Sequence, residues 1–209
     1  MPRRVLIVQG HPDPAGGHYC HALAESSLEG AAAAGHEIRR IDVAKIDFPL
    51  LRSAAEWKEG TVPASLEEAQ RGIVWAEHLL FIFPLWMGDM PALLKGFIEQ
   101  VARPGFAFDP GDGGPFGQKK LKGRSARVVV TMGMPALVYR YIYRAHSLRS
   151  LERNILGFIG IAPIHETLIG MVEGPDPKLR AGWLEKLRAL GRELGLPEGD
   201  LSTLESDEK

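Results

Sequence analysis

The stretch FIFPLWMGDMPALLKGFIEQVARPGFAF, residues 81–108, decides the fold of this chain. Its apolar run stops at Pro84, a turn follows, and a helical pattern opens at Pro91. A short apolar run followed at once by a turn and an amphipathic helix is typical of a buried parallel strand and its crossover helix. The turn itself carries Trp86 and Met87, which are either ordinary core residues or contacts for a ligand.

The same order of strand, turn and helix extends in both directions from this stretch, which predicts an α/β fold with a doubly wound parallel sheet and helices on both faces. Asp89 is expected to cap the helix that opens at Pro91, and Ser65 with Glu68 predicts a capping box. Residues 47–63 show no regular period. The predicted strands are 4–10, 36–46, 78–84, 126–133 and 163–170, and the other predicted helices are 18–34, 65–77, 141–160 and 176–195.

Length, composition and charge limit the function classes. The 209 residues are 45% hydrophobic, which suits a single domain over residues 1–196 with a charged, frayed tail over 197–209. A formal net charge of −1 argues against a nucleic-acid partner. The longest apolar stretch, LLFIFPLWM, contains a proline and is far shorter than the roughly 20 residues of a membrane helix. The lone Cys20 and the short apolar part of the N-terminus favour a cytoplasmic protein.

A ligand site is expected at the carboxyl ends of the strands, where parallel sheets of this kind bind their ligands. The loops there read GHPDPAGGHY (10–19), PLWMGDM (84–90) and TMGMPALVY (131–139). Glycine lets backbone N–H groups approach a ligand, and aromatic side chains pack on a flat one. We therefore expect a planar small molecule as the partner.

The first of these loops ends at a helix N-terminus near His18, which favours a phosphate with His11 as a further donor. The alternative is an ordinary strand-to-helix turn. No strand is followed by G-x-G-x-x-G or a P-loop, including GDGGPFG at 111–117. HYCH at 18–21 does not supply a metal site, and Cys20 has no base beside it, so neither metal nor nucleophilic catalysis is expected.

The segment after the fourth strand offers protons. Tyr139, Tyr141, Tyr143 and His146 follow the loop at 131–139. They either pack along a helix face or supply protons and stabilise developing negative charge in the crevice.

The residues PLWMGDMPALLKGFIEQV, GFAF, VLIVQGHPDP and TMGMPALVY resemble the flavodoxin-fold NAD(P)H:quinone oxidoreductase family over roughly residues 4–170. The resemblance implies a five-stranded sheet of order 2-1-3-4-5, a flavin (FMN or FAD), NAD(P)H as electron donor, a quinone-like acceptor and a homodimer with its sites at the interface.

The resemblance also implies a role for each matching position. The flavin phosphate would lie in the first loop, the ring would rest on the turn after the third strand, and two residues after the fourth strand would relay charge. HYC stands where the family usually has a serine, an aromatic residue and an asparagine. The implied cofactor residues are His11, His18, Tyr19, Cys20, Pro84, Leu85, Trp86, Met87, Thr131, Gly133 and Met134, and the implied catalytic residues are Tyr139 and, one position beyond the family spacing, His146.

Two other functions stay open on the sequence alone. A flavodoxin-type electron carrier would be expected to have a strongly acidic docking face, whereas this chain has 26 acidic and 25 basic residues. A regulatory flavoprotein subunit of a transporter is the second alternative. Turnover of NAD(P)H with a quinone by the isolated protein distinguishes the enzyme from both.

Overall fold

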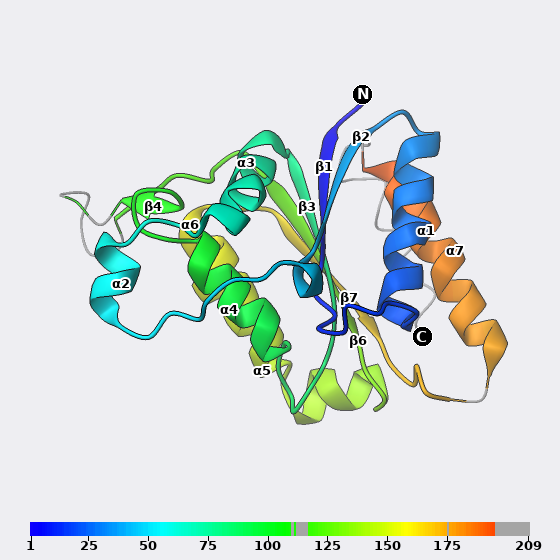
Figure 1. Ribbon diagram of the computed structural model, residues 1–209. Helices are drawn as coiled ribbons and strands as arrows, with labels where there is room; N and C mark the ends of the chain where they lie inside the picture. Colours follow the sequence, from blue (N-terminus) through cyan, green and yellow to red (C-terminus); the bar gives the residue numbers. More distant parts are fainter. Residues whose placement is uncertain (110, 112–116, 175, 195–209) are drawn as a thin grey trace.

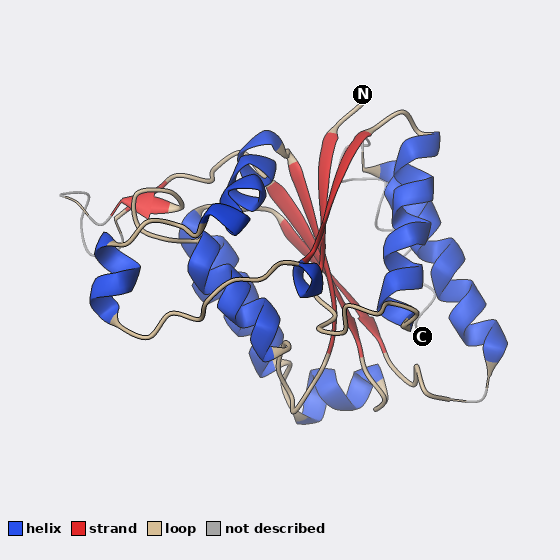
Figure 2. Ribbon diagram, in the orientation of Figure 1, coloured by secondary structure: helices blue, strands red, loops and turns tan. Residues whose placement is uncertain are grey.

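The computed structural model describes residues 1–109, 111, 117–174 and 176–194. Its centre is a parallel five-stranded sheet in the order β2-β1-β3-β6-β7, with helices on both faces (Figure 1, Figure 2). Counted within this sheet alone, the order is 2-1-3-4-5, which confirms the predicted doubly wound fold. Its strands are β1 Arg4–Gln9, β2 Glu37–Asp42, β3 His78–Pro84, β6 Ser125–Thr131 and β7 Ile164–Ile169.

The central strands are buried on both faces because their residues alternate between two cores. Leu6 and Val8 of β1 belong to one core, and Val5 and Ile7 to the other. The second core lies under α1 (Tyr19–Ala33) and α7 (Pro177–Glu193), which pack side by side (Figure 1). The opposite face is covered by α3 Glu67–Trp75, α4 Ala92–Val101, α5 His146–Arg149, η4 Ser150–Leu156 and α6 Gly157–Ile159.

The prediction of one continuous helix over 141–160 is wrong, because the structure divides this region into several helical pieces. Helical structure begins earlier, in the π-helical segment η3 Val138–Ile142, where the Tyr143 amide donates to Val138. Arg144 and Ala145 then adopt positive φ angles of 55° and 46°, and α5 starts after this break. Left-handed residues cannot continue a right-handed helix, so the chain turns here and resumes as α5, η4 and α6.

Residues 47–63 were expected to be irregular, yet they contain α2 (Ala54–Glu59). Ser53 caps α2, its Oγ accepting the Glu56 amide at 3.1 Å. A helix of six residues is too short to show a period in the sequence, which is why the pattern missed it. The strand predicted over 36–46 is wrong after Asp42, where the chain turns into η1 Val43–Lys45. Other short elements that the sequence did not predict are η2 Ala64–Leu66 and the antiparallel pair β4 Phe108–Asp109 and β5 Gln118–Lys119.

Two predicted helix caps are wrong. Ser65 lies inside η2, because the Leu66 amide bonds to Pro63 and α3 starts only at Glu67, with no side-chain cap. Asp89 does not cap α4, whose N-cap is Pro91.

Asp89 instead closes the turn after β3. Its backbone exchanges two hydrogen bonds with Trp86, at 2.8 and 2.9 Å. The side chain of Asp89 is used in the same turn, because its Oδ1 accepts the amide of the next residue, Met90, at 2.7 Å and not an amide of α4.

The predicted tail at 197–209 and most of the loop at 111–117 fall outside the described residues. In the part of the chain that the structure describes, no helix has the length and apolar character needed to cross a membrane.

Candidate functional site at the carboxyl edge of the sheet

The structure brings the three predicted loops together at the carboxyl edge of the sheet. The rings of His11 and Trp86 join the first and second loops, with centroids 5.9 Å apart in an edge-on arrangement. The Leu85 amide donates to the Thr131 carbonyl at 2.7 Å, which ties the second loop to the end of β6. We call this edge, formed by the loops after β1, β3, β6 and β7, the rim.

The first loop is shaped by its own side chains. Gln9 Oε1 accepts the His11 amide at 2.8 Å, His11 Nδ1 accepts the Asp13 amide at 3.2 Å, and Asp13 Oδ1 accepts the Ala15 amide at 2.9 Å. Gly16 and Gly17 follow with φ angles of 75° and 77°, a conformation that strongly favours glycine. The loop thereby leads the chain into α1, whose N-cap is His18.

The N-terminus of α1 is open to an anion. Its N-cap, His18, makes no side-chain cap bond, and the first turn holds no acidic residue. The first N–H groups of a helix have no partner within the helix, and the helix dipole adds partial positive charge there. An anionic group such as a phosphate is the natural partner for this end.

Tyr19 and Cys20 are held by neighbouring elements. The Tyr19 hydroxyl donates to the Arg180 carbonyl of α7 at 2.7 Å, and burial raises its pKa to about 12. Cys20 Sγ lies 3.1 Å from Thr131 Oγ1, and burial raises the pKa of this thiol to about 11. Cys20 therefore remains a thiol at neutral pH and connects α1 to β6.

Three histidines lie around the start of α1. His11 and His18 stack with ring centroids 4.0 Å apart, and His21 lies 5.3 Å from His11. His18 Nε2 also bonds to Asp13 Oδ2 at 2.6 Å. Burial, followed by the neighbouring His18 and His21, lowers the pKa of His11 to about 4.

The turn after β3 presents its apolar residues to the outside. Trp86 is 50% exposed, and Met87 is fully exposed with a φ of 50°. Pro84 and Leu85 beneath them are partly buried. A rigid turn that holds an indole beside the open helix end offers a flat apolar surface next to an anion site, which is what a planar ligand with a phosphate tail requires.

The end of β6 is packed against the loop after β7. The Met171 amide donates to Met134 at 3.2 Å, and a Cβ on Gly170 would overlap the Ala136 nitrogen. Gly133 beside them faces the carboxylate of Glu173.

Tyr139 and His146 are placed differently from each other. Tyr139 is only 2% exposed, and its hydroxyl bonds to Ser147 Oγ at 2.7 Å and accepts the Leu148 amide at 3.2 Å. His146 is exposed. The Tyr139 hydroxyl thus points into the core in this structure, and the exposed hydroxyls of the segment are those of Tyr141 and Tyr143.

Sequence reasoning missed several rim residues. Gln9 is buried under α1, and the strand alternation that puts Val5 and Ile7 on this face could have found it. From the sequence, His21 was considered only as a possible metal ligand together with His18. Met171 and Glu173, in the loop after β7, carried no signal in the sequence.

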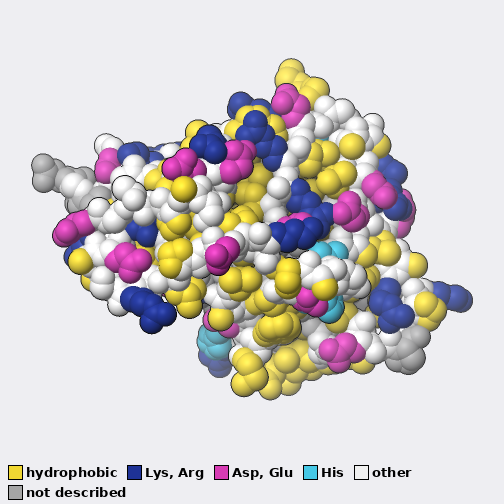
Figure 3. Space-filling view, in the orientation of Figure 1, with side chains coloured by type: hydrophobic (Ala, Val, Ile, Leu, Met, Phe, Trp, Pro, Cys, Tyr) yellow, Lys and Arg dark blue, Asp and Glu magenta, His cyan; other side chains and the backbone are white. Residues whose placement is uncertain are grey.

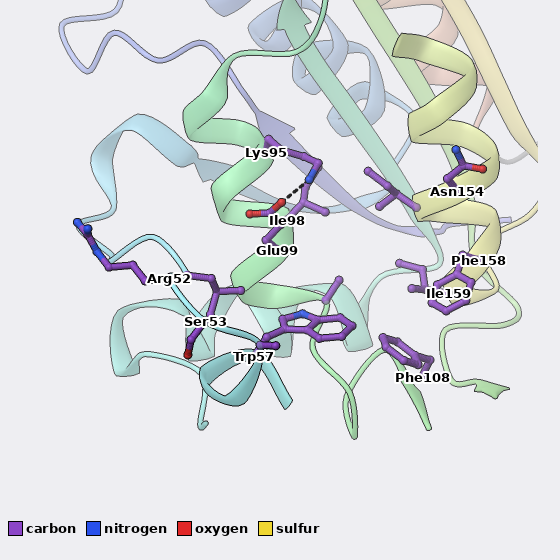
Figure 4. Close-up of a pocket in the computed structure, with 14 residues that line it drawn as sticks. Arg52, Ser53, Trp57, Lys95, Ile98, Glu99, Phe108, Asn154, Phe158 and Ile159 are labelled. Atoms are coloured by element: carbon purple, nitrogen blue, oxygen red, sulfur yellow. Dashed lines mark hydrogen bonds and ion pairs between the residues drawn. The ribbon is translucent and has the colours of Figure 1, made fainter. Parts of the chain in front are cut away.

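A cavity of about 620 Å³ lies elsewhere, between α2, α4 and residues 154–159 (Figure 4). Its wall is aromatic, with ring centroids 5.8 Å apart for Trp57 and Phe108. Lys95 and Glu99 pair with each other at its edge. It offers no open helix end, so the rim is the better candidate for a ligand with an anionic tail. Among the described residues, no group of three or more His, Cys, Asp or Glu side chains could hold a metal ion.

The fold defines the chain as an α/β protein with a doubly wound parallel sheet, and the rim is its candidate site for a planar ligand with an anionic tail. Residues 3–190 match the family model described as flavodoxin-like fold. The chain belongs to this family.

Named relatives are oxidoreductases. The chain is 30% identical over 156 residues to a ribosyldihydronicotinamide dehydrogenase-like protein of Penicillium crustosum, covering 62% of this chain and 57% of that protein. It is 26% identical over 223 residues to NAD(P)H dehydrogenase (quinone) 1 of Rattus norvegicus, covering 91% of this chain and 78% of the relative. The solved NAD(P)H:quinone oxidoreductase of Methanothermobacter marburgensis superposes with a TM-score of 0.79 at 25% identity, over 93% of this chain and 98% of that one.

Proposed function

We propose that this protein is a flavin-dependent NAD(P)H:quinone oxidoreductase. The observation that carries the proposal is the contact between His11 and Trp86, which sets an open helix N-terminus beside an exposed apolar turn. The names of the relatives, NAD(P)H dehydrogenase (quinone) and NAD(P)H:quinone oxidoreductase, support the same activity.

The residues at the rim fit a flavin. The first turn of α1 offers donors and no carboxylate, which suits a phosphate. The side chain of Gln9 keeps a buried Nε2 without a partner among the described residues, so a donor is left over at this end. We propose that the flavin is held by His11, His18, Tyr19, Cys20, Pro84, Leu85, Trp86, Met87, Thr131, Gly133 and Met134.

A bound flavin would supply the redox chemistry, accepting a hydride equivalent from NAD(P)H and passing two electrons to the quinone-like acceptor in a ping-pong sequence. Trp86 and Met87 orient the flat ligand and shield one of its sides from water. Tyr139 and His146 are proposed to relay charge. Tyr139 is joined through its hydroxyl to Ser147, the residue after His146 in α5.

We propose that the protein acts as a homodimer with its sites at the interface. Large apolar side chains are exposed beside the rim, and hydrophobic side chains gather along the lower edge of the molecule in Figure 3. A surface of this kind is typical of a protein–protein contact. The exposed residues there are Met87, Leu137, Tyr141, Ile142, Tyr143 and Met171.

We further propose a single domain over residues 1–196 and a cytoplasmic location. The described residues form the central sheet and the helices that pack on it, and the free thiol of Cys20 suits a reducing compartment.

The test is to purify the protein, extract its cofactor for a visible spectrum and a mass, and measure NADH and NADPH oxidation with a quinone. We expect FMN or FAD and steady turnover. A flavin without turnover would favour the electron carrier or the regulatory subunit, and a protein that neither contains nor binds a flavin would contradict the proposed function.

A further inference from the structure

The three histidines at the start of α1 are too close to be protonated together without cost. The centroids of His11 and His18 are 4.0 Å apart, and His21 lies 5.8 Å from His18. Like charges at such distances repel, and each proton taken up makes the next less favourable. Protonation of one of these rings therefore opposes protonation of the other two.

The surroundings also lower the pKa of two of the three rings, His11 and His21. Burial is the largest cause that lowers the pKa of His11, with His18 and His21 next, and Asp13 only partly opposes them. Burial is also the largest cause that lowers the pKa of His21.

Several charged groups surround the cluster, most of them already paired. Arg40 forms ion pairs with Glu25 and with Asp42, which also pairs with Lys45. Asp42 raises and Arg40 lowers the pKa of His21. Asp13 therefore acts on His11 and bonds to His18, and Arg40 and Asp42 of β2 act on His21. Glu25 of α1 and Lys45 of η1 stand behind them as ion-pair partners of Arg40 and Asp42.

Two buried polar atoms at this end have no hydrogen-bond partner in the described part of the chain: Gln9 Nε2 and His21 Nδ1. Gln9 is 1% exposed, and because its Oε1 accepts the His11 amide, its carboxamide faces the first loop. Buried polar atoms are normally satisfied, so these two indicate a missing partner. An anion rich in acceptor oxygens would satisfy Gln9 Nε2 and a protonated His21.

We propose that His18 and His21 bind the phosphate end of the flavin in protonated form, so that the protein takes up protons when it binds a phosphorylated flavin. His11 assists them as a neutral donor through Nε2, because its Nδ1 accepts the Asp13 amide. His21 is thereby a binding residue, and Gln9 assists it. The inference rests on the proposed function, because a flavin must bind for its phosphate to be held.

The linkage between proton binding and flavin binding sets the direction in which the affinity changes with pH. The phosphate monoester of FMN carries between about −1.5 and −2 charges at pH 7 and favours the charged form of an imidazole that contacts it. The complex then holds more protons than the free protein, and affinity falls as the pH rises through the range in which the complex releases them. Since the second phosphate pKa is about 6, the fall is expected between about pH 6.5 and about pH 8.

The experiment starts from protein freed of its flavin, to which FMN, FAD and riboflavin are added at several pH values while flavin fluorescence is followed. Each proton taken up gives about a tenfold rise in the Kd per pH unit. We expect this rise for the phosphorylated flavin that the protein retains and no rise for riboflavin, which lacks the phosphate. Calorimetry in two buffers of different ionisation enthalpy should show net proton uptake with the phosphorylated flavin only.

Variants assign the effect to the cluster. His18→Gln and His21→Gln are expected to flatten the pH dependence, whereas His36→Gln, at the opposite end of α1, should retain it. A Kd for FMN and FAD that does not change with pH, or an unchanged slope in both cluster variants, would overturn the inference while leaving flavin binding and the proposed enzyme intact. Failure to bind riboflavin, FMN and FAD alike would overturn the inference and the proposed function together.

Discussion

At the residue scale, the site depends on side chains held in exposed positions by hydrogen bonds of the backbone. Trp86 is half exposed, yet both of its backbone polar groups are bonded to Asp89. The fixed backbone pre-positions the indole, so a flat ligand that packs against it need not first order the turn.

Replacing Trp86 with alanine is expected to weaken flavin binding about tenfold, the scale of a lost aromatic contact plus its buried area. Trp75→Ala is the control, because Trp75 lies on α3 and packs against Arg39 away from the rim. The test is the dissociation constant of the flavin, measured by fluorescence. Equal constants for the two variants would show that Trp86 does not belong to the cofactor site.

Tyr139 combines a proposed role in charge relay with a structural one. Its hydroxyl accepts the buried Leu148 amide, so Tyr139→Phe should lower the free energy of unfolding by about 1–3 kcal/mol. We also expect flavin reduction by NAD(P)H to slow by about 100-fold, as for loss of a proton-transfer group. Tyr143→Phe, which changes an exposed hydroxyl, serves as the control, and an unchanged stopped-flow rate in Tyr139→Phe would leave that residue with a purely structural role.

At the scale of elements, α1 and α7 approach each other backbone to backbone. A Cβ on Gly30 would overlap the Arg188 carbonyl, and one on Gly191 would overlap the Ser27 carbonyl. Only glycine allows this distance, and the close packing fixes the position of α1, whose first turn forms part of the rim.

Gly30→Ala should therefore lower the free energy of unfolding by about 3 kcal/mol, because the helices must separate. Gly182→Ala provides the matched control on α7, since nothing lies within 4 Å of its added Cβ. There the better helix propensity of alanine should add up to about 1 kcal/mol. Urea unfolding of the two variants tests the packing, and equal stabilities would contradict it.

At the scale of the whole molecule, acid destabilises the fold through buried histidines. Burial is the main cause that lowers the pKa of His78 to about 3, and its Nε2 has no partner among the described residues. The unfolded chain takes up a proton below about pH 6.5, whereas the folded chain does not until about pH 3. Stability is thus lost as the pH falls through this window.

His78→Gln should reduce the stability difference between pH 7 and pH 5 by about 2 kcal/mol. This is the free energy of about 1.5 pH units, the distance between pH 5 and the pKa of histidine in the unfolded chain. The measurement is urea unfolding of both proteins at each pH. A pH dependence that persists unchanged in the variant would show that other groups cause the acid sensitivity.

The apolar surface beside the rim predicts association. Ile142 is 72% exposed there, and Ile142→Glu is expected to weaken the proposed homodimer at least tenfold, because it places a charge in the contact. Val74→Glu, at a residue 53% exposed on α3, introduces the same charge elsewhere. Sedimentation of both variants over a range of concentrations checks this, and a wild-type protein that stays monomeric would contradict the dimer.

Much of this fold could be predicted from the sequence because buried parallel strands are continuous apolar runs. HLLFIFP and ARVVVTMG have few other interpretations, and the predicted range for the first matches β3. Short or distorted elements were missed, since α2 has only six residues and the break at Arg144 and Ala145 follows no periodic pattern. The two predicted helix caps were wrong for a related reason, because the residues around Ser65 and Asp89 form hydrogen bonds that the sequence does not reveal.

The sequence alone determined the order of strands and helices along the chain, because hydrophobic periodicity and turn residues are local properties. That order also determined that the predicted ligand loops follow the carboxyl ends of the strands. Only the tertiary structure decided which side chains meet at that edge. The contact of His11 with Trp86 and the contact of Cys20 with Thr131 join segments that are far apart in the sequence, and their packing is set by the whole core.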